Sequence, residues 1–163
     1  TKRYGRYQIL LCRKCYQGER NAAGETRRGS IIPRYIGAAG TSMQFWGKWC
    51  SIGGNMDINA SNNIHASLIE FRDETSTNFH ISRRLIYKGA FISSNGVPIF
   101  WSFLPWEYAM RLNTNSGSNI DIIKSSHGEI AENQWVDINY VLNMDLCHYV
   151  RDSFIEFRSK ARI

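Results

Sequence analysis

Three carboxylates in one short segment, Glu70, Asp73 and Glu74, are the side chains best spaced to do chemistry. On a helix, their i, i+3 and i+4 positions share one arc about 100° wide. Like charges this close repel unless a cation lies among them, and carboxylate oxygens suit hard cations such as Mg²⁺ or Mn²⁺. The spacing therefore predicts a divalent-metal site. The alternative is that the three carboxylates simply form a solvated acidic surface of the helix.

Residues 61 to 75 have the pattern of the helix that these carboxylates require. The stripe at helical spacing consists of Ile64, Leu68, Phe71 and Thr75. It would pack on a sheet and leave the acids facing outward. Because the three charges repel, Glu74→Gln is expected to leave the melting temperature unchanged or to raise it.

Positive charge is concentrated in residues 1 to 34. This segment contains nine Lys and Arg against two Glu, a net charge of +7, and the remainder has a net charge of −1. Such a distribution favours binding of a polyanion near the carboxylates, although a solvated basic face has the same composition. Candidate substrate-binding side chains, for phosphates or for base stacking, are Arg13, Lys14, Arg27, Arg28, Trp46, Lys48 and Trp49.

Hydrophobic patterns elsewhere predict a single α+β domain over residues 1–163. Expected strands cover 7–14, 43–52 and 134–137, and an expected hairpin joins 85–92 to 97–104. Residues 145–160 have the spacing of a closing amphipathic helix. Expected loops are a basic, glycine-rich segment at 17–42 and polar segments at 113–119 and 125–133.

The stretch from residue 53 to residue 76 resembles the signature of the Nudix hydrolase family, in a degenerate form. Gly53-Gly54 follows a predicted strand, and residues 69–76, IEFRDETS, match the second half of the signature. The resemblance implies a Nudix-like α/β/α sandwich with a mixed β-sheet, and Mg²⁺ or Mn²⁺ as the cofactor. The metal-binding carboxylates that it implies are Glu70, Asp73 and Glu74.

The reaction implied by the resemblance is hydrolysis of a diphosphate linkage in a nucleoside diphosphate linked to another group. Glu70 or Glu74 would be the nearest carboxylate to accept a proton from the attacking water. In this family an acid from a late loop often serves as base or additional ligand, which here would be Glu129 or Glu132. Candidate substrates are nucleotides, dinucleotides, inositol pyrophosphates and capped RNA.

The signature is incomplete, which leaves a second function open. Its first Glu is missing, and Ile69 stands where the family has the Arg that orients the acids. The alternative is a catalytically inactive protein of the same fold that binds RNA or a nucleotide. Survival of all three acids favours the enzyme, because a protein that only binds gains nothing from a repulsive triplet.

The four cysteines, at positions 12, 15, 50 and 147, are too few and too scattered for a disulfide scaffold. A reducing, cytoplasmic location is therefore expected. No apolar run approaches the length of a membrane span, so no membrane association is expected. The sequence leaves the oligomeric state open, a homodimer included.

Overall fold

The centre of the fold is strand β2 (Arg6–Lys14), which confirms the strand expected over residues 7–14. The computed structural model describes residues 1–14, 47–53, 60–75, 86–110 and 130–163. In β2, the consecutive residues Leu10, Leu11 and Cys12 are all buried. Because neighbouring side chains of a strand point to opposite faces, both faces of β2 are covered by other parts of the chain.

Strand β2 has partners on both edges. Strand β6 (Ile130–Asp137) runs antiparallel along one edge. The short strands β1 (Lys2–Arg3) and β3 (Trp49–Cys50) pair antiparallel with the opposite edge. These four strands form one sheet, with β2 in the middle.

The second sheet is the predicted hairpin, formed by β4 (Ile86–Ile92) and β5 (Pro98–Phe103). Its turn is closed by the Ser93 N–H, which donates to the Val97 carbonyl oxygen at 2.9 Å. The expected mixed α+β class is confirmed. However, the described strands form two small antiparallel sheets rather than one mixed sheet, and parallel pairing among them is confined to an isolated bridge between Trp49 and Leu146.

Helix α1 (Asn63–Thr75) confirms the helix expected over residues 61–75 and begins two residues later. Its start is set by Asn62, whose Oδ1 accepts a hydrogen bond from the His65 N–H at 2.8 Å. This side chain satisfies one of the amide groups that have no partner within the first turn.

The closing helix α4 (His148–Ala161) begins three residues later than the expected helix at 145–160. The reason is strand β3. The Trp49 N–H donates to the Asp145 carbonyl oxygen, and the Cys147 N–H donates to the Trp49 carbonyl oxygen, each at 2.9 Å. These bonds use backbone groups that a helix would need.

The loop expected at 125–133 is wrong over its last four residues, which belong to β6. There Asn133 pairs with Cys12, and Glu132 pairs with Arg13. The polar side chains of Glu132 and Asn133 interrupt the hydrophobic pattern, so the pattern does not indicate a strand there. The glycine-rich segment 17–42, residues 43–46 of the expected second strand and the loop 113–119 lie outside the described residues.

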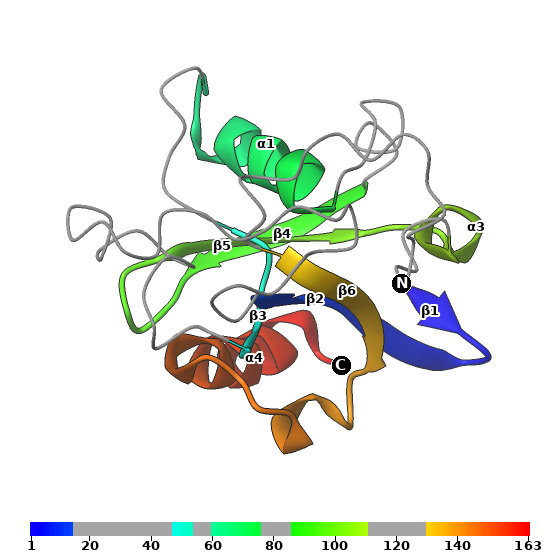
Figure 1. Cartoon of the computed structure of the whole chain (residues 1–163). Helices are drawn as coiled ribbons and strands as arrows, with labels where there is room; N and C mark the ends of the chain where they lie inside the picture. Colours follow the sequence, from blue (N-terminus) through cyan, green and yellow to red (C-terminus); the bar gives the residue numbers. More distant parts are fainter. Residues whose placement is uncertain (15–46, 54–59, 76–85, 111–129) are drawn as a thin grey trace.

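Helices α1 and α4 lie on opposite sides of the strands (Figure 1). One core cluster joins β2 and β6 to α4 through Leu11, Val136 and Phe154. Another joins Leu10 to Leu104 and to Ala109 of the short helix α3 (Trp106–Ala109). The 3₁₀ helix η5 (Val141–Asn143) connects β6 toward α4. None of the helices in the described ranges is long and apolar enough to cross a membrane.

Gly89 lies where a side chain cannot be accommodated without movement. A Cβ atom built on Gly89 overlaps the Trp101 ring of the neighbouring strand, and that ring also contacts Phe157 of α4. We expect Gly89→Ala to lower the free energy of unfolding by about 1–3 kcal/mol, the usual cost of overpacking. Urea denaturation measures this loss. Gly53→Ala is the matched control, because no atom of the described residues lies within 4 Å of its built Cβ, and equal losses in the two variants would contradict the packing argument.

Candidate functional site

A buried ion pair lies where the end of β2 meets the end of α1. The Lys14 Nζ lies 2.7 Å from Oε1 of Glu74, and each side chain is only 2% exposed. The carbonyl end of a helix carries partial negative charge, so a carboxylate in the last turn of α1 is unfavourable on its own. The Lys14 ammonium compensates both the carboxylate and the helix end.

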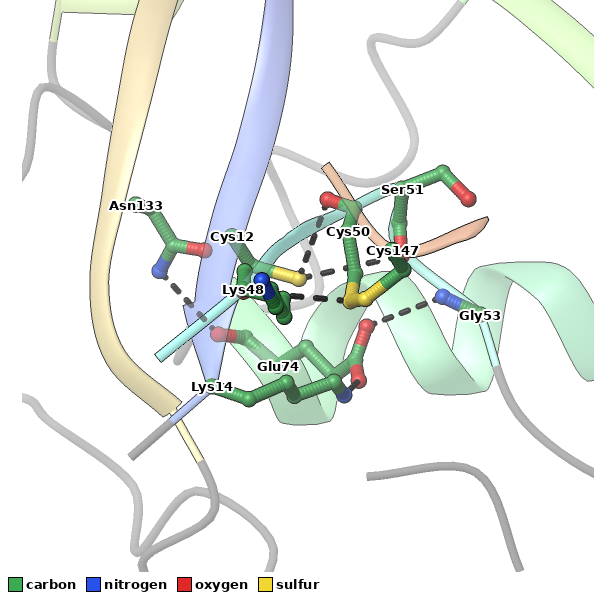
Figure 2. A network of polar contacts seen from close by, with 9 residues as sticks. All are labelled: Cys12, Lys14, Lys48, Cys50, Ser51, Gly53, Glu74, Asn133 and Cys147. Atoms are coloured by element: carbon green, nitrogen blue, oxygen red, sulfur yellow. Dashed lines mark hydrogen bonds and ion pairs between the residues drawn. A yellow bond between two sulfur atoms is a disulfide. The ribbon is translucent and has the colours of Figure 1, made fainter. Parts of the chain in front are cut away.

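The remaining contacts of Glu74 tie α1 to two further elements (Figure 2). Its second carboxylate oxygen, Oε2, accepts a hydrogen bond from the Gly53 N–H at 2.9 Å. Its backbone carbonyl accepts one from Asn133 Nδ2 of β6 at 3.1 Å. Glu74 therefore joins α1 to β2, to β6 and to the Gly53 segment that follows β3.

Tyr149 of α4 lies in the same electrostatic environment. Burial raises the pKa of its phenol to about 12, an effect that the nearby charge of Lys14 partly opposes. The phenol therefore stays protonated near neutral pH and adds no charge to the Lys14 and Glu74 pair. Sequence reasoning missed Tyr149, because nothing in its local pattern distinguishes it from a helix residue that packs in the core.

The other described cations predicted to bind substrate also pair with carboxylates. The Arg13 Nε lies 3.7 Å from Oε1 of Glu132, its partner in the β2 and β6 register. The Lys48 Nζ lies 2.6 Å from Oδ1 of Asp145, in a pair that is largely open to solvent. A predicted phosphate-binding cation therefore contacts a predicted catalytic acid at two places. These pairs are Lys14 with Glu74 and Arg13 with Glu132.

Cysteines form a second feature beside the ion pair. Cys50 of β3 and Cys147, which precedes α4, form a disulfide. The buried Cys12 thiol donates to the Cys50 carbonyl oxygen at 3.4 Å. Cys50 and Cys147 are 97 residues apart in the sequence, so no local spacing indicates that they form a disulfide. The cytoplasmic location stays a prediction, and the disulfide is the feature that argues against it.

The remaining predicted site residues are only partly placed. Glu70 is half-buried on α1, about one turn before Glu74. Trp49 is half-buried and packs against the Leu11 cluster, which gives it a structural role beside the predicted base stacking. The side chain of Asp73 is not among those described. Outside the described residues lie Arg27, Arg28, Trp46 and Glu129.

The carboxylates suit a divalent cation by their donor chemistry, with one obstacle. Carboxylate oxygens are the ligands of Mg²⁺ and Mn²⁺, and the Lys14 ammonium already occupies a cation position at Glu74. Both oxygens of Glu74 accept hydrogen bonds in this arrangement, and in the described part of the chain no group of three His, Cys, Asp or Glu side chains is placed to hold a metal. A metal at Glu74 thus requires that Lys14 move away.

Comparison with known proteins finds no match to this chain among family models, curated proteins or solved structures. A function for this chain is therefore proposed from its residues and their contacts.

Proposed function

We propose that the chain is a Nudix-type hydrolase that cleaves a diphosphate linkage in a nucleoside diphosphate linked to another group. The observation that carries the proposal is the contact between Lys14 and Glu74, which are 60 residues apart in the sequence. The basic end of β2 and the acidic end of α1 are the two parts that the sequence assigns to phosphate and to metal. Their contact supports a single site for both chemistries.

The positions of α1 and α4 on opposite sides of the strands support a Nudix-like α/β/α sandwich (Figure 1). The family is proposed from the resemblance at residues 53–76. Ile69 replaces the Arg that orients the acids in the family, and the Lys14 ammonium holds the Glu74 carboxylate in place until a metal displaces it.

Glu70, Asp73 and Glu74 are the residues proposed to hold Mg²⁺ or Mn²⁺. The metal, when bound, supplies positive charge against the phosphate oxygens of the substrate. Lys14, released from Glu74, and Arg13 beside it would hold further phosphate oxygens. Glu70 and Glu132 are the described carboxylates proposed to accept a proton from water.

One observation favours a second candidate function, binding of RNA or a nucleotide without hydrolysis. Glu74 is buried and neutralised by Lys14. The pair gives Glu74 a structural role, so the presence of Glu74 alone does not favour an enzyme. The Lys14 and Glu74 pair at the end of α1 would then stabilise the fold and take no part in a reaction.

A substrate panel separates the two functions. The chain is incubated with Mg²⁺ or Mn²⁺ and with nucleoside di- and triphosphates, dinucleotides, inositol pyrophosphates and capped RNA, and products are resolved by chromatography. Metal-dependent products support the hydrolase. Binding of one of these compounds without any product supports the second candidate.

Glu70→Gln tests the catalytic assignment on whichever substrate the panel identifies. We expect turnover to fall by at least about 10²-fold, equivalent to about 2.7 kcal/mol of barrier, because the change removes a charge while keeping the shape of the side chain. Circular dichroism checks that the variant is folded. Glu107→Gln on α3 is the matched control, since Glu107 is an exposed carboxylate on another helix. Full turnover by Glu70→Gln would remove Glu70 from the site.

A further inference from the structure

The hairpin that joins β1 and β2 holds an aromatic side chain in an unusual position. Tyr4 and Gly5 form its two-residue turn, with φ values of 47° and 78°. Two positive φ values are typical of a type I′ turn, which Gly and Asn adopt easily and Tyr does not. The Tyr4 residue is 90% exposed, so burial does not offset this cost. A strained and exposed ring is a reason to look for a ligand.

An arginine packs against this ring, and a second arginine lies beside the first. The Arg3 guanidinium carbon lies 5.1 Å from the centre of the Tyr4 ring and 4.6 Å from that of Trp106 on α3. These two rings fix the orientation of the guanidinium through cation–π contacts. Arg6 lies directly opposite Arg3 in the strand register, where like charges repel. The hairpin therefore keeps two arginines together against their repulsion.

The two arginines line a hollow in the surface. The hollow has a volume of about 540 Å³, is open to solvent and is lined by Arg3, Tyr4, Arg6, Gln8 and Asp137. Asp137 lies 3.7 Å from Arg6, whose side chain is 78% exposed, so this pair is weak and offsets the positive charge only in part.

Gln8 adds an independent observation. Its Oε1 is buried yet has no hydrogen-bond partner in the part of the chain that the structure describes. A buried acceptor without a donor is costly, and a ligand that carries a hydroxyl or amino group would satisfy it.

We propose that this hollow binds a nucleotide unit of a single-stranded nucleic acid. Arg3 and Arg6 hold the phosphate, and the base stacks on the face of Tyr4 that is open to solvent. A sugar hydroxyl or a base amino group donates to Gln8 Oε1 once the Gln8 side chain turns into the hollow that it lines. A phosphate alone would use the arginines but would leave the exposed ring without a role. This binding does not depend on the proposed hydrolysis.

Fluorescence anisotropy tests the proposal with a labelled oligouridylate of about ten nucleotides, a length within the usual range for such sites. The measurement is made on the whole chain in EDTA, so that hydrolysis cannot contribute. Tyr4→Asn should weaken binding by at least about tenfold, because Asn fits the turn but provides no ring. Tyr4→Phe keeps the ring and should bind within about twofold of the parent.

Arg6→Gln tests the phosphate contact separately. It should reduce the slope of log affinity against log salt by about 0.7, the value for one phosphate contact to a single strand. Lys88→Gln is the matched control, since Lys88 is an exposed cation on β4 of the other sheet. It should leave the slope unchanged.

Competitors distinguish the source of affinity. Uridine monophosphate should compete weakly, because it fills a single unit of the site. Equal affinities of the parent and Tyr4→Asn, or displacement of the oligonucleotide by inorganic polyphosphate with no effect of Tyr4→Asn, would overturn the proposal. The measurement in EDTA does not depend on catalysis, so failure of the proposed hydrolysis leaves this result intact.

Discussion

Replacement of Lys14 by methionine should lower the free energy of unfolding by about 3–5 kcal/mol, the loss typical when one partner of a buried ion pair is removed. Lys14 and Glu74 are each 2% exposed. The carboxylate oxygens of Glu74 have two described donors, the Lys14 ammonium and the Gly53 N–H. Without the ammonium, the buried carboxylate would keep only the Gly53 N–H. Urea denaturation followed by circular dichroism at neutral pH measures the loss.

Two further variants make this result specific. Lys48→Met removes the same side chain from the exposed pair with Asp145, and it should cost no more than about 1 kcal/mol. The double variant Lys14→Met with Glu74→Leu should recover much of the stability, because a buried ion pair replaced by apolar residues is often nearly neutral. Similar losses for Lys14→Met and Lys48→Met would show that burial does not govern the pair.

The same contact reverses an expectation drawn from the sequence. Three neighbouring carboxylates repel, so Glu74→Gln was expected to leave the melting temperature unchanged or to raise it. In the structure the charge of Glu74 compensates a buried ammonium. Glu74→Gln should therefore lower the melting temperature, because the Lys14 charge would remain buried with a neutral partner.

Loss of the disulfide should have the second large effect. Cys50 and Cys147 are 97 residues apart, and a link over such a loop removes much of the conformational entropy of the unfolded chain. The chain-entropy estimate for this length is about 4.7 kcal/mol, and measured losses for native disulfides are about 2–5 kcal/mol. We expect Cys147→Ala to lower the free energy of unfolding within that range.

A reductant provides the control for this prediction. Dithiothreitol should lower the urea midpoint of the parent toward that of Cys147→Ala and should leave the midpoint of the variant unchanged. Alkylation followed by mass spectrometry should count two more reactive thiols after reduction of the unfolded parent. A parent whose thiol count and midpoint are both insensitive to reduction would lack the bond in solution.

Sequence patterns predicted the elements whose signals are local. The apolar run of β2, the helical stripe of α1 and the turn between β4 and β5 each depend on residues close together in the chain, and all three are confirmed. Glu132 and Asn133 are polar, so the local pattern predicts a loop where the structure has a strand. Their strand conformation comes from pairing with β2, which no local pattern records.

The contacts of the candidate site were less accessible to sequence reasoning. The sequence predicts separate roles for Lys14 and Glu74, and their contact spans 60 residues. The Cys50 and Cys147 bond spans 97. Side chains this far apart meet only because the elements that carry them pack together, so their pairing is a property of the tertiary fold.

The position of the disulfide also determines how the chain responds to cleavage. The bond closes residues 50–147 into a covalent ring, which contains α1, the β4 and β5 hairpin and β6. Strand β2 and helix α4 are attached outside this ring. A protease that cuts one peptide bond anywhere between Cys50 and Cys147 would therefore open the ring without releasing a fragment, and the nicked protein would keep its mass, apart from one added water, until it was reduced.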